Sequence, residues 1–277
     1  MKENKVKVIN KKFFIHLVLI LGVVVTVTPF IWMLLTSLKT LGESTQVPPV
    51  IFPKKAMWSN YLEVLKTLPF KQFYLNTIIS TVFKTVGQLI FCSMAAYAFA
   101  RINFPLKNII FVLILSVLMV PGQIFLLPQY MIIQKLGLLN SITALILPGL
   151  FSAFGTFLLR QFFMTLPDEL EEAAILDGCN HFQIYWKIMM PLAKPGLVSL
   201  AVFTTLWSWN DLMWPLIVNT ATEKLTLSAG LASLQGQHGT NFPLLMSGSV
   251  MTVLPMLVLF IIFQKQFIEG IAFTGGK

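Results

Sequence analysis

Carboxylate side chains are concentrated in one short segment of a chain that otherwise contains few of them. Asp and Glu total 11 of the 277 residues. Enzyme chemistry would require such groups to converge with further reactive side chains. The clustered acids, all between positions 168 and 177, are Asp168, Glu169, Glu171, Glu172 and Asp177.

No such convergence is evident elsewhere in the sequence. The histidines His16, His181 and His238 are scattered and offer no metal-ligand spacing. Cys92 and Cys179 support no disulfide framework, and ordinary packing accounts for the Cys92 thiol. Neither a Ser/His nor a paired-Asp arrangement occurs within the apolar segments. We therefore expect no catalytic residues, no metal site and no enzyme activity.

The composition indicates a protein of the lipid bilayer. Hydrophobic residues make up 56% and charged residues 11%, whereas soluble domains carry about 25% charged residues. The net charge of +9 does not indicate nucleic-acid binding, because the lysines flank apolar runs and form no basic stripe among aromatic side chains. We expect an integral membrane protein that contacts lipid and has no nucleic-acid partner.

Six apolar stretches are long enough to cross a bilayer, which requires about 20 helical residues. The distribution of Lys and Arg orients the chain so that both termini and the acidic segment face the cytoplasm. The expected fold class is an all-α membrane protein with six transmembrane helices, in which a cytoplasmic segment (1–12) precedes one transmembrane domain (13–277). The predicted spans are residues 13–35, 73–100, 108–127, 141–163, 197–218 and 244–267.

The acidic segment is predicted to form two short helices between the fourth and fifth spans. Thr165 would cap the first helix, and Gly178 would end it in a left-handed conformation. Asn180 would cap the second helix, and Pro191 would end it. One apolar face of the second helix would carry, at i, i+3, i+4 and i+7 spacing, Phe182, Tyr185, Trp186 and Met189.

Periodicity leaves two interpretations of this helix pair. It could lie on the bilayer surface with its acids in water, or it could dock against another protein. Docking is favoured because helices on a membrane surface usually present Lys or Arg to anionic lipid. In addition, Ala173 and Ala174 would leave a flat patch that another backbone can approach.

A long motif in this segment resembles the cytoplasmic loop of permeases from binding-protein-dependent ABC importers. Glu172-Ala173-Ala174 is followed after three residues by Gly178 and, nine residues later, by Ile188-Met189-Met190-Pro191. The family pattern has Leu at Met190, a side chain of similar volume. Further matches are similar to the shorter permease of carbohydrate importers of the maltose-transporter type: Asn76-Thr77, residues 95–101, Trp209-Asn210-Asp211, Pro215, Gln264-Lys265 and the tail from Phe267.

This resemblance implies a coupling role for the loop, about residues 164–195, and a set of partners. The loop would dock on a cytoplasmic ABC ATPase dimer, which would use ATP, because this chain has no phosphate-binding loop and binds no cofactor of its own. A second, non-identical permease and an extracytoplasmic solute-binding protein would complete the importer in a bacterial cell membrane. The implied coupling residues are Glu172, Ala173, Ala174, Asp177 and Gly178, with Ile188, Met190 and Pro191 anchoring the loop against the membrane helices.

Charged residues inside spans are candidates for a solute path, since burying them in a bilayer is costly. Lys84 lies in the second span, and Asp211 lies in the fifth beside Trp209 and Asn210. These groups could hydrogen-bond to a sugar and stack against it. Alternatively, Asn210 and Asp211 lock helices together, or Asp211 reaches the outer interface within a belt of tryptophans.

The expected function is that of a permease in an ATP-driven importer for a sugar or oligosaccharide. The alternatives are a permease for another polar solute, such as a glycerol phosphate or a polyol, and a secondary transporter, which would carry more intramembrane carboxylates. The polar loop before the last span is either a disordered connector or, as in similar permeases, a contact with the solute receptor. The receptor contact would involve Gln235, Gly236, Gln237 and His238.

Overall fold

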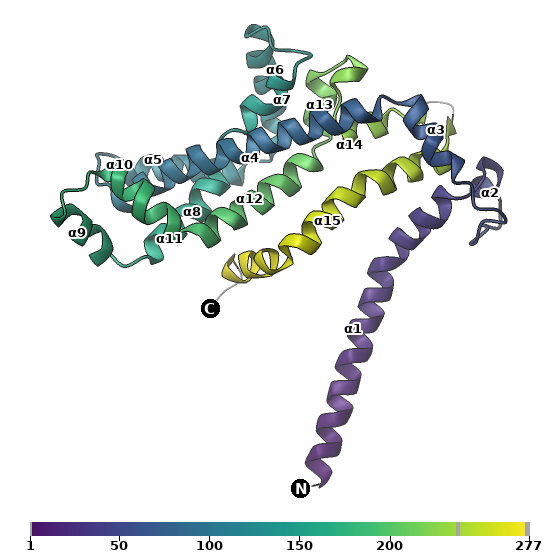
Figure 1. The fold of residues 1–277 in the computed structure, drawn as a ribbon, viewed down its shortest axis with the longest axis horizontal. Coiled ribbons are helices and arrows are strands. Elements are labelled where there is room, and N and C mark those ends of the chain that lie inside the picture. Colours follow the sequence, from purple (N-terminus) through teal and green to yellow (C-terminus); the bar gives the residue numbers. More distant parts are fainter. Residues whose placement is uncertain (1, 237–238, 275–277) are drawn as a thin grey trace. The chain divides into compact units, whose positions relative to one another are not determined.

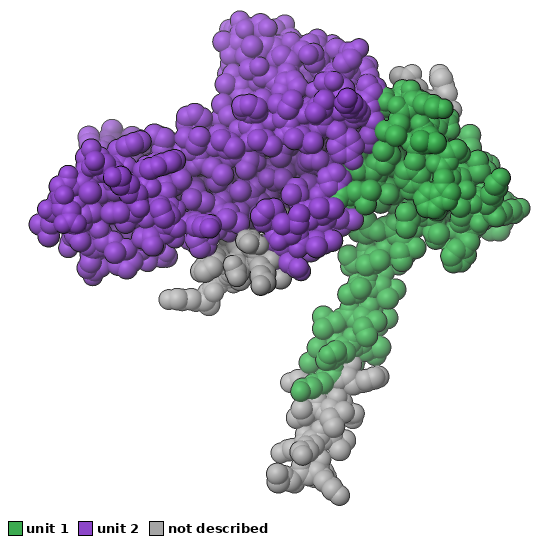
Figure 2. All heavy atoms as spheres, in the orientation of Figure 1, with its two compact units in different colours: residues 1–68, 231–254 green, residues 69–230, 255–277 purple. Residues whose placement is uncertain are grey.

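Helices form nearly all the regular structure in the computed structural model, which describes residues 2–236 and 239–274. The chain divides into two compact units, Met1–Leu68 with Leu231–Leu254 and Pro69–Gly230 with Pro255–Lys277 (Figure 2). Within the described residues the only sheet is one pair of two-residue strands. The predicted all-α class is confirmed.

The first unit is built around the end of its N-terminal helix. The Asn60 side-chain amide on α3 donates to the carbonyls of Ser37 and Lys39 at 2.8 and 2.9 Å. The Ser247 hydroxyl on α15 donates to the Ser37 carbonyl at 3.1 Å. These bonds join three helices of this unit, which comprises α1 (Lys2–Ser37), α2 (Leu41–Thr45), α3 (Ser59–Thr67), β1 (Gln235–Gly236), β2 (Gly239–Thr240) and the first part of α15 (Phe242–Thr274).

The second unit is a bundle in which α4 (Phe70–Arg101) is the longest helix (Figure 1). Both α8 (Ala153–Thr165) and α12 (Lys194–Trp209) pack along α4 and against each other. The other elements are α5 (Lys107–Ser116), η1 (Val117–Met119), η2 (Gly122–Phe125), α6 (Leu126–Lys135), α7 (Ile142–Ile146), η3 (Leu147–Gly149), α9 (Glu169–Leu176), α10 (His181–Ile184), η4 (Tyr185–Met189), α11 (Met190–Leu192), α13 (Met213–Val218), η5 (Thr222–Lys224), α14 (Leu227–Ala232, which ends in the first unit) and the rest of α15.

A large cluster of buried apolar side chains holds α4, α8 and α12 together. Gly155 on α8 lies close to both α4 and α12, since an added Cβ would lie 2.9 Å from a Leu200 methyl and 3.1 Å from the Cys92 sulfur. Interiors packed this closely tolerate little added volume. The buried members of this cluster, called the bundle core below, are Cys92, Ala96, Tyr97, Leu158, Leu159, Phe163, Ala174, Ile184, Tyr185, Met189, Ala193 and Leu200.

Some of the membrane segments are continuous helices and others are bent. By length and composition, three continuous helices could cross a membrane, and up to six segments could if each bent pair counts as one. The continuous segments are Phe14–Ser37, Phe70–Arg101 and Phe242–Gln264; the bent pairs are Lys107–Met119 with Gly122–Lys135 (103°), Ile142–Gly149 with Ala153–Thr165 (42°) and His181–Leu192 with Lys194–Trp209 (77°).

The predicted third span, residues 108–127, is not one helix. The first helical run ends at Met119, Val120 is extended with φ −98° and ψ 130°, and a new run starts at Gly122. Pro121 explains the break, because proline has no backbone N–H and disfavours a helical conformation of the residue before it. Pro121 is visible in the sequence, but the prediction of this span followed the long apolar run and did not place a break there.

Candidate functional site

The predicted fifth span, residues 197–218, is interrupted at the residues that the sequence analysis singled out. The helix α12 ends at Trp209, and α13 begins only at Met213. Asp211 lies in this break, and its Oδ1 accepts a hydrogen bond from the backbone N–H of Trp214 at 3.4 Å. Non-helical backbone within a membrane segment is tolerated where it is buried in protein or lines a cavity.

Asp211 faces Lys84 of α4. The Lys84 Nζ lies 3.4 Å from the Asp211 Oδ2, and the two side chains are 10% and 25% exposed. Gly149 packs against the aliphatic part of the lysine, because an added Cβ would lie 2.9 Å from the Lys84 Cδ. The two predicted intramembrane charges therefore form an ion pair whose lysine is held from one side.

Lys84 and Asp211 line a polar pocket of about 260 Å³. The Thr204 hydroxyl donates to the Gln88 Oε1 at 2.8 Å, and the exposed Trp207 adds an aromatic face. Hydroxyl, amide and charged groups beside an aromatic ring suit a solute that carries hydroxyl groups around an apolar ring. The residues that form this wall, called the polar pocket below, are Lys84, Gln88, Thr204, Trp207, Ser208 and Asp211.

Two of the predicted path residues lie outside the polar pocket. Trp209 is buried, and its ring packs edge-on against Tyr74 at 6.4 Å between centroids. Asn210 is exposed, and its side-chain amide donates to a carbonyl of its own helix α12 at 2.8 Å. Trp214 is buried and donates its indole N–H to the Ala144 carbonyl at 2.9 Å. Of the three tryptophans near Asp211, Trp209 and Trp214 are thus buried and Trp207 is exposed.

The sequence analysis missed Gln88, Thr204 and Ser208, although a signal for them exists on α4. Polar residues recur there at spacings of three and four, which places them along one side of the helix. This polar side faces α12: the Thr81 hydroxyl donates to the Ser208 hydroxyl at 3.1 Å, and the hydroxyls of Thr85 and Thr205 lie 3.4 Å apart. The α4 residues concerned are Thr77, Thr81, Lys84, Thr85 and Gln88.

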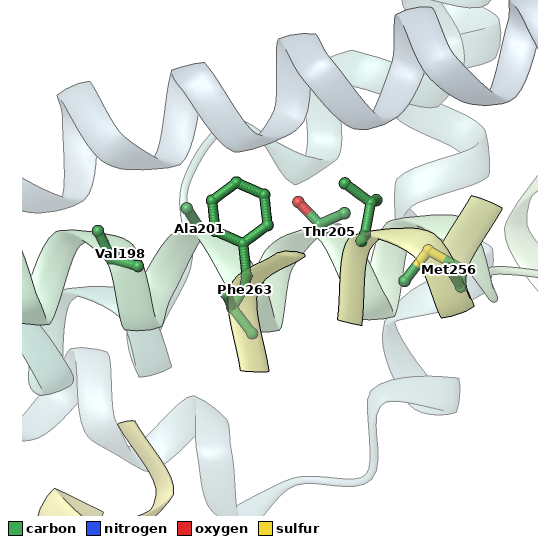
Figure 3. Close-up of a pocket in the computed structure, with 7 residues that line it drawn as sticks. Val198, Ala201, Thr205, Met256 and Phe263 are labelled. Carbon is green, nitrogen blue, oxygen red and sulfur yellow. The ribbon is translucent and has the colours of Figure 1, made fainter. Parts of the chain in front are cut away.

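A second pocket, of about 210 Å³, lies between α12 and the part of α15 that belongs to the same unit (Figure 3). Among the described residues of its wall, Thr205 is the only polar one. Such a wall offers few hydrogen bonds, so this pocket is not a candidate for a polar solute. Its lining is Val198, Ala201, Val202 and Thr205 from α12 and Met256, Leu259 and Phe263 from α15.

The two short helices predicted between the fourth and fifth spans are present as α9 and the run from α10 to α11. Gly178 has φ +79°, and its N–H and that of Cys179 donate to carbonyls in the last turn of α9. This is the hydrogen-bond pattern of a Schellman cap. Asn180 and Gln183 form a capping box with two bonds of 2.9 Å. The predicted glycine stop and asparagine cap are confirmed.

Two other details of this helix pair differ from the prediction. Thr165 does not cap α9, because it is the last residue of α8 and its hydroxyl donates to the Phe162 carbonyl at 2.7 Å. Pro191 does not end the second helix but lies within α11. The π-helical turn η4 precedes it, and there the Met190 N–H donates to the Tyr185 carbonyl. In this wider turn the backbone N–H groups bond to carbonyls five residues back. It lies just before Pro191, which has no backbone N–H.

The predicted apolar face of the second helix is divided. Tyr185 and Met189 are buried in the bundle core, whereas Phe182 and Trp186 are exposed. Each pair has i, i+4 spacing, so the four side chains form two neighbouring rows, and only one row faces the bundle. The side chains of the other row, Phe182 and Trp186, are mostly exposed on the described chain.

Two of the five clustered acids bind their own chain. Glu171 is 12% exposed, accepts a hydrogen bond from the Tyr97 hydroxyl at 3.0 Å, and lies 3.9 Å from the Arg101 Nε and 3.7 Å from the His181 Nδ1. Asp168 forms an ion pair with Arg101. These contacts tie α9 to the end of α4. Asp168 is nevertheless exposed, as are Glu169, Glu172 and Asp177.

The predicted flat patch of two alanines is not present. Ala173 is exposed, but Ala174 packs within the bundle core, since consecutive helical residues point about 100° apart. Ile188 and Met190 are half-buried against the same core, and Pro191 is exposed. Ala174 therefore packs against the bundle instead of forming part of an exposed patch.

The polar loop before the last span contains the hairpin β1–β2. Gln235 pairs with Thr240 and Gly236 with Gly239 in antiparallel register. Gln235 and Gly236 therefore belong to regular structure and not to the disordered connector considered as an alternative. Gln237 and His238, the other two predicted receptor contacts, lie outside the described residues.

Comparison with known proteins identifies the family. A family model described as "Binding-protein-dependent transport system inner membrane component" matches residues 88–265. The chain belongs to this family. It is therefore a membrane component of a transport system and not an enzyme, and the alternative of a secondary transporter is not retained. The match covers the helix pair entirely and the polar pocket from Gln88 onward.

Individual relatives extend the comparison over nearly the whole chain. The arabinooligosaccharides transport system permease protein of Bacillus subtilis (strain 168) is 39% identical over 253 residues, 90% of each protein. The sn-glycerol-3-phosphate transport system permease protein of Yersinia pestis bv. Antiqua (strain Antiqua) is 34% identical over 266 residues, 93% of this chain and 95% of the relative. One chain of a bacterial ABC transporter involved in import of the acidic polysaccharide alginate superposes with a TM-score of 0.81 at 26% identity, covering 93% of this chain and 97% of that one.

Proposed function

We propose that this chain is one of two permease subunits that form the membrane path of an ATP-driven importer for a carbohydrate. The names of its relatives support this proposal, because arabinooligosaccharides and alginate are both carbohydrates. The relative named for sn-glycerol-3-phosphate supports a second candidate, a permease for a phosphorylated polyol. In both cases the solute is rich in hydroxyl groups.

The observation that carries the proposal is the two-sided helix pair between α8 and α12. Its inner side contributes Ala174, Tyr185 and Met189 to the bundle core, while its outer side leaves Leu176 88% exposed and Phe182 uncovered. Exposed apolar side chains on a segment with exposed acids favour docking of a protein. The inner packing would transmit a displacement of the pair to the bundle, because packed interiors are nearly incompressible. A coupling element driven by a separate ATPase requires an outer side that binds the ATPase and an inner side that packs against the membrane helices.

The proposed importer contains a cytoplasmic ABC ATPase dimer, a second, non-identical permease and an extracytoplasmic solute-binding protein. The ATPase uses the ATP, since the sequence of this chain has no G-x-x-x-x-G-K-[ST] loop, and the chain binds no cofactor. Both termini and the helix pair lie on the cytoplasmic side of a bacterial cell membrane, following the distribution of Lys and Arg. The solute-binding protein contacts the other side at Gln235, Gly236, Gln237 and His238.

The polar pocket is the proposed part of the solute path. Lys84 and Asp211 provide charged hydrogen-bonding groups, and Trp207 provides a ring face for an apolar side of the solute. Trp209 and Asn210 are not assigned to the path, because their side chains do not line the pocket. At the end of α12, beside Asp211, Trp209 instead packs against Tyr74, and Asn210 hydrogen-bonds to a carbonyl of its own helix.

Transport by the reconstituted complex tests the function. The four kinds of subunit are placed in proteoliposomes, and uptake of a radiolabelled arabinooligosaccharide is followed with and without ATP on the ATPase side. We expect uptake only with ATP, the ATPase and the solute-binding protein together, and glycerol 3-phosphate is the parallel probe for the second candidate. Uptake by this chain without the ATPase would refute the proposal.

Docking of the helix pair is tested by substitution at neighbouring exposed positions of α9. Ala173→Trp should release the ATPase during purification, because a bulky side chain forced into a packed contact costs about 1–3 kcal/mol. Glu172→Gln is the matched control and should retain the ATPase, since one exposed charge contributes less than about 1 kcal/mol. Cysteines at 173 that label freely in the assembled complex and never cross-link to the ATPase would support the bilayer-surface interpretation instead.

A further inference from the structure

The polar pocket contains one positive and one negative group, and they neutralise each other. The Lys84 Nζ lies 3.4 Å from the Asp211 Oδ2. The rest of the described wall, Gln88, Thr204, Trp207 and Ser208, carries no formal charge. The lining as a whole is therefore polar but electrically neutral.

Both members of the pair are held in place by their surroundings. Gly149 lies against the lysine stem so closely that an added Cβ would be 2.9 Å from Cδ. Asp211 sits in the break between α12 and α13, where its second oxygen accepts the Trp214 N–H at 3.4 Å. A solute that enters the pocket therefore meets the lysine and the carboxylate together.

This arrangement treats neutral and anionic solutes differently. Hydroxyl groups both donate and accept, so a sugar can bind the lysine, the carboxylate and the amide of Gln88 at once. An anion drawn to Lys84 would lie beside Asp211, and attraction and repulsion would largely cancel while the anion still lost its hydration. Only Asp211 prevents Lys84 from acting as an anion site.

We propose that the polar pocket accepts electrically neutral polyhydroxylated solutes and rejects phosphate esters and uronates, with Asp211 as the residue that determines this specificity. The inference rests on the proposed function in taking the pocket as part of the solute path. It favours a neutral oligosaccharide over a glycerol phosphate and over an acidic polysaccharide.

The test measures the charge preference of the pocket without any transported solute. Ser208→Cys places a thiol in the pocket wall of the assembled, solubilised complex, in a chain whose Cys92 and Cys179 are replaced by Ala. The modification rates by the anionic sulfonatoethyl and the neutral hydroxyethyl methanethiosulfonates are read by mass spectrometry of this chain. The rate with the anionic reagent is divided by the rate with the neutral reagent. This ratio is then divided by the same ratio for 2-mercaptoethanol in solution, which corrects for the different intrinsic reactivities of the two reagents.

With Lys84 and Asp211 intact, the corrected ratio should lie below one, because the wall has no net charge and an entering anion loses its hydration without compensation. Asp211→Asn should raise the ratio about tenfold or more by leaving the lysine unopposed, and Lys84→Met should lower it by a similar factor. The neutral pair Lys84→Met with Asp211→Asn should return the ratio to the value of the unsubstituted pocket, and this variant serves where a single change prevents assembly.

Two results would overturn the inference. One is a ratio of one or more in the unsubstituted pocket, which would mean that anions enter as readily as neutral molecules despite Asp211. The other is a ratio in the neutral pair that stays as far from the unsubstituted value as in a single variant. Failure of the proposed function is separate, because absent sugar uptake by the reconstituted complex leaves the labelling ratio unchanged.

Discussion

At the scale of single residues, the ion pair between Lys84 and Asp211 explains how two charges are accommodated within apolar segments. Each charge alone would be costly to bury, and the cost falls when a partner of opposite sign lies within a few ångströms. The pair also joins α4 to the break after α12, with 3.4 Å between Nζ and Oδ2. A structural and a solute-binding role are therefore compatible at these two positions.

Removing one member of the pair should be more harmful than exchanging the two. Loss of one partner from a fully buried pair costs about 3–5 kcal/mol, and the cost here is smaller because Asp211 keeps 25% exposure. Lys84→Met or Asp211→Asn should each lower uptake and the yield of assembled complex, measured by affinity purification. The exchange Lys84→Asp with Asp211→Lys should recover part of both. Single variants that both behave as wild type would contradict this role.

Gly178 is expected to matter for coupling beyond its effect on stability. Its φ of +79° strains any other residue by about 1–2 kcal/mol, and the two helices that it joins would be re-aimed. Gly178→Ala should reduce uptake at unchanged membrane abundance. Gly137→Ala is the matched control, since Gly137 has φ +68° and neither added Cβ meets an atom within 4 Å. Equal uptake by the two variants would remove the coupling role.

At the scale of elements, α9 is attached to the bundle by charge and by packing at the same time. Glu171 and Asp168 hold it to Arg101 at the end of α4, while Ala174 sits in the bundle core. The concentration of acids in this segment is thus partly explained within the chain itself. Glu169, Glu172 and Asp177 are exposed and remain available to a partner, which is the role that the family resemblance implies for Glu172 and Asp177.

Two adjacent glutamates of α9 should respond differently to loss of charge. Glu171→Gln weakens the contacts with Tyr97, Arg101 and His181, and the hydrogen bond from the Tyr97 hydroxyl to the charged carboxylate contributes about 1.5–3 kcal/mol. Amide hydrogen exchange in α9 should therefore become faster, by about tenfold or more. Glu172→Gln, one position on and exposed, should leave exchange unchanged. The same exchange rate in both variants would show that α9 is held by packing alone.

At the scale of the whole molecule, α4 links the two candidate sites of the second unit. One end carries Tyr97 and Arg101, which contact α9, and its middle carries Lys84 and Gln88 of the polar pocket (Figure 1). The backbone hydrogen bonds of one continuous helix connect these two positions without a break. Displacement of the helix pair by an ATPase would therefore reach the pocket through α4.

The contact of α4 with α8 and α12 should be sensitive to one added methyl group. Gly155→Ala places a Cβ 2.9 Å from Leu200 and 3.1 Å from Cys92, and overpacking costs about 1–3 kcal/mol. The thermal unfolding temperature of the solubilised complex should fall. Gly22→Ala, in the interior of α1 with nothing within 4 Å, should keep or raise it, because Ala favours helix by about 1 kcal/mol. A higher temperature for Gly155→Ala would contradict this packing.

The sequence by itself determined the features that depend on neighbouring residues. Apolar length gave the membrane class, and the left-handed Gly178 and the Asn180 cap followed from backbone sterics and hydrogen bonds within one turn. The motif around Glu172 indicated the family that the comparisons establish. Pro121 carried the signal for the broken third span, but composition alone does not weigh a local break against a long apolar run.

Only the tertiary structure decided which side chains meet. Lys84 and Asp211 are 127 positions apart, and the register between α4 and α12 depends on close approach at residues such as Gly155, which no periodicity encodes. The same holds for Ala174, Phe182 and Trp186, because a helical face is defined by whatever packs against it. Local sequence determines the direction in which a side chain points along its helix, whereas its partner is determined by the packing of helices distant in the chain.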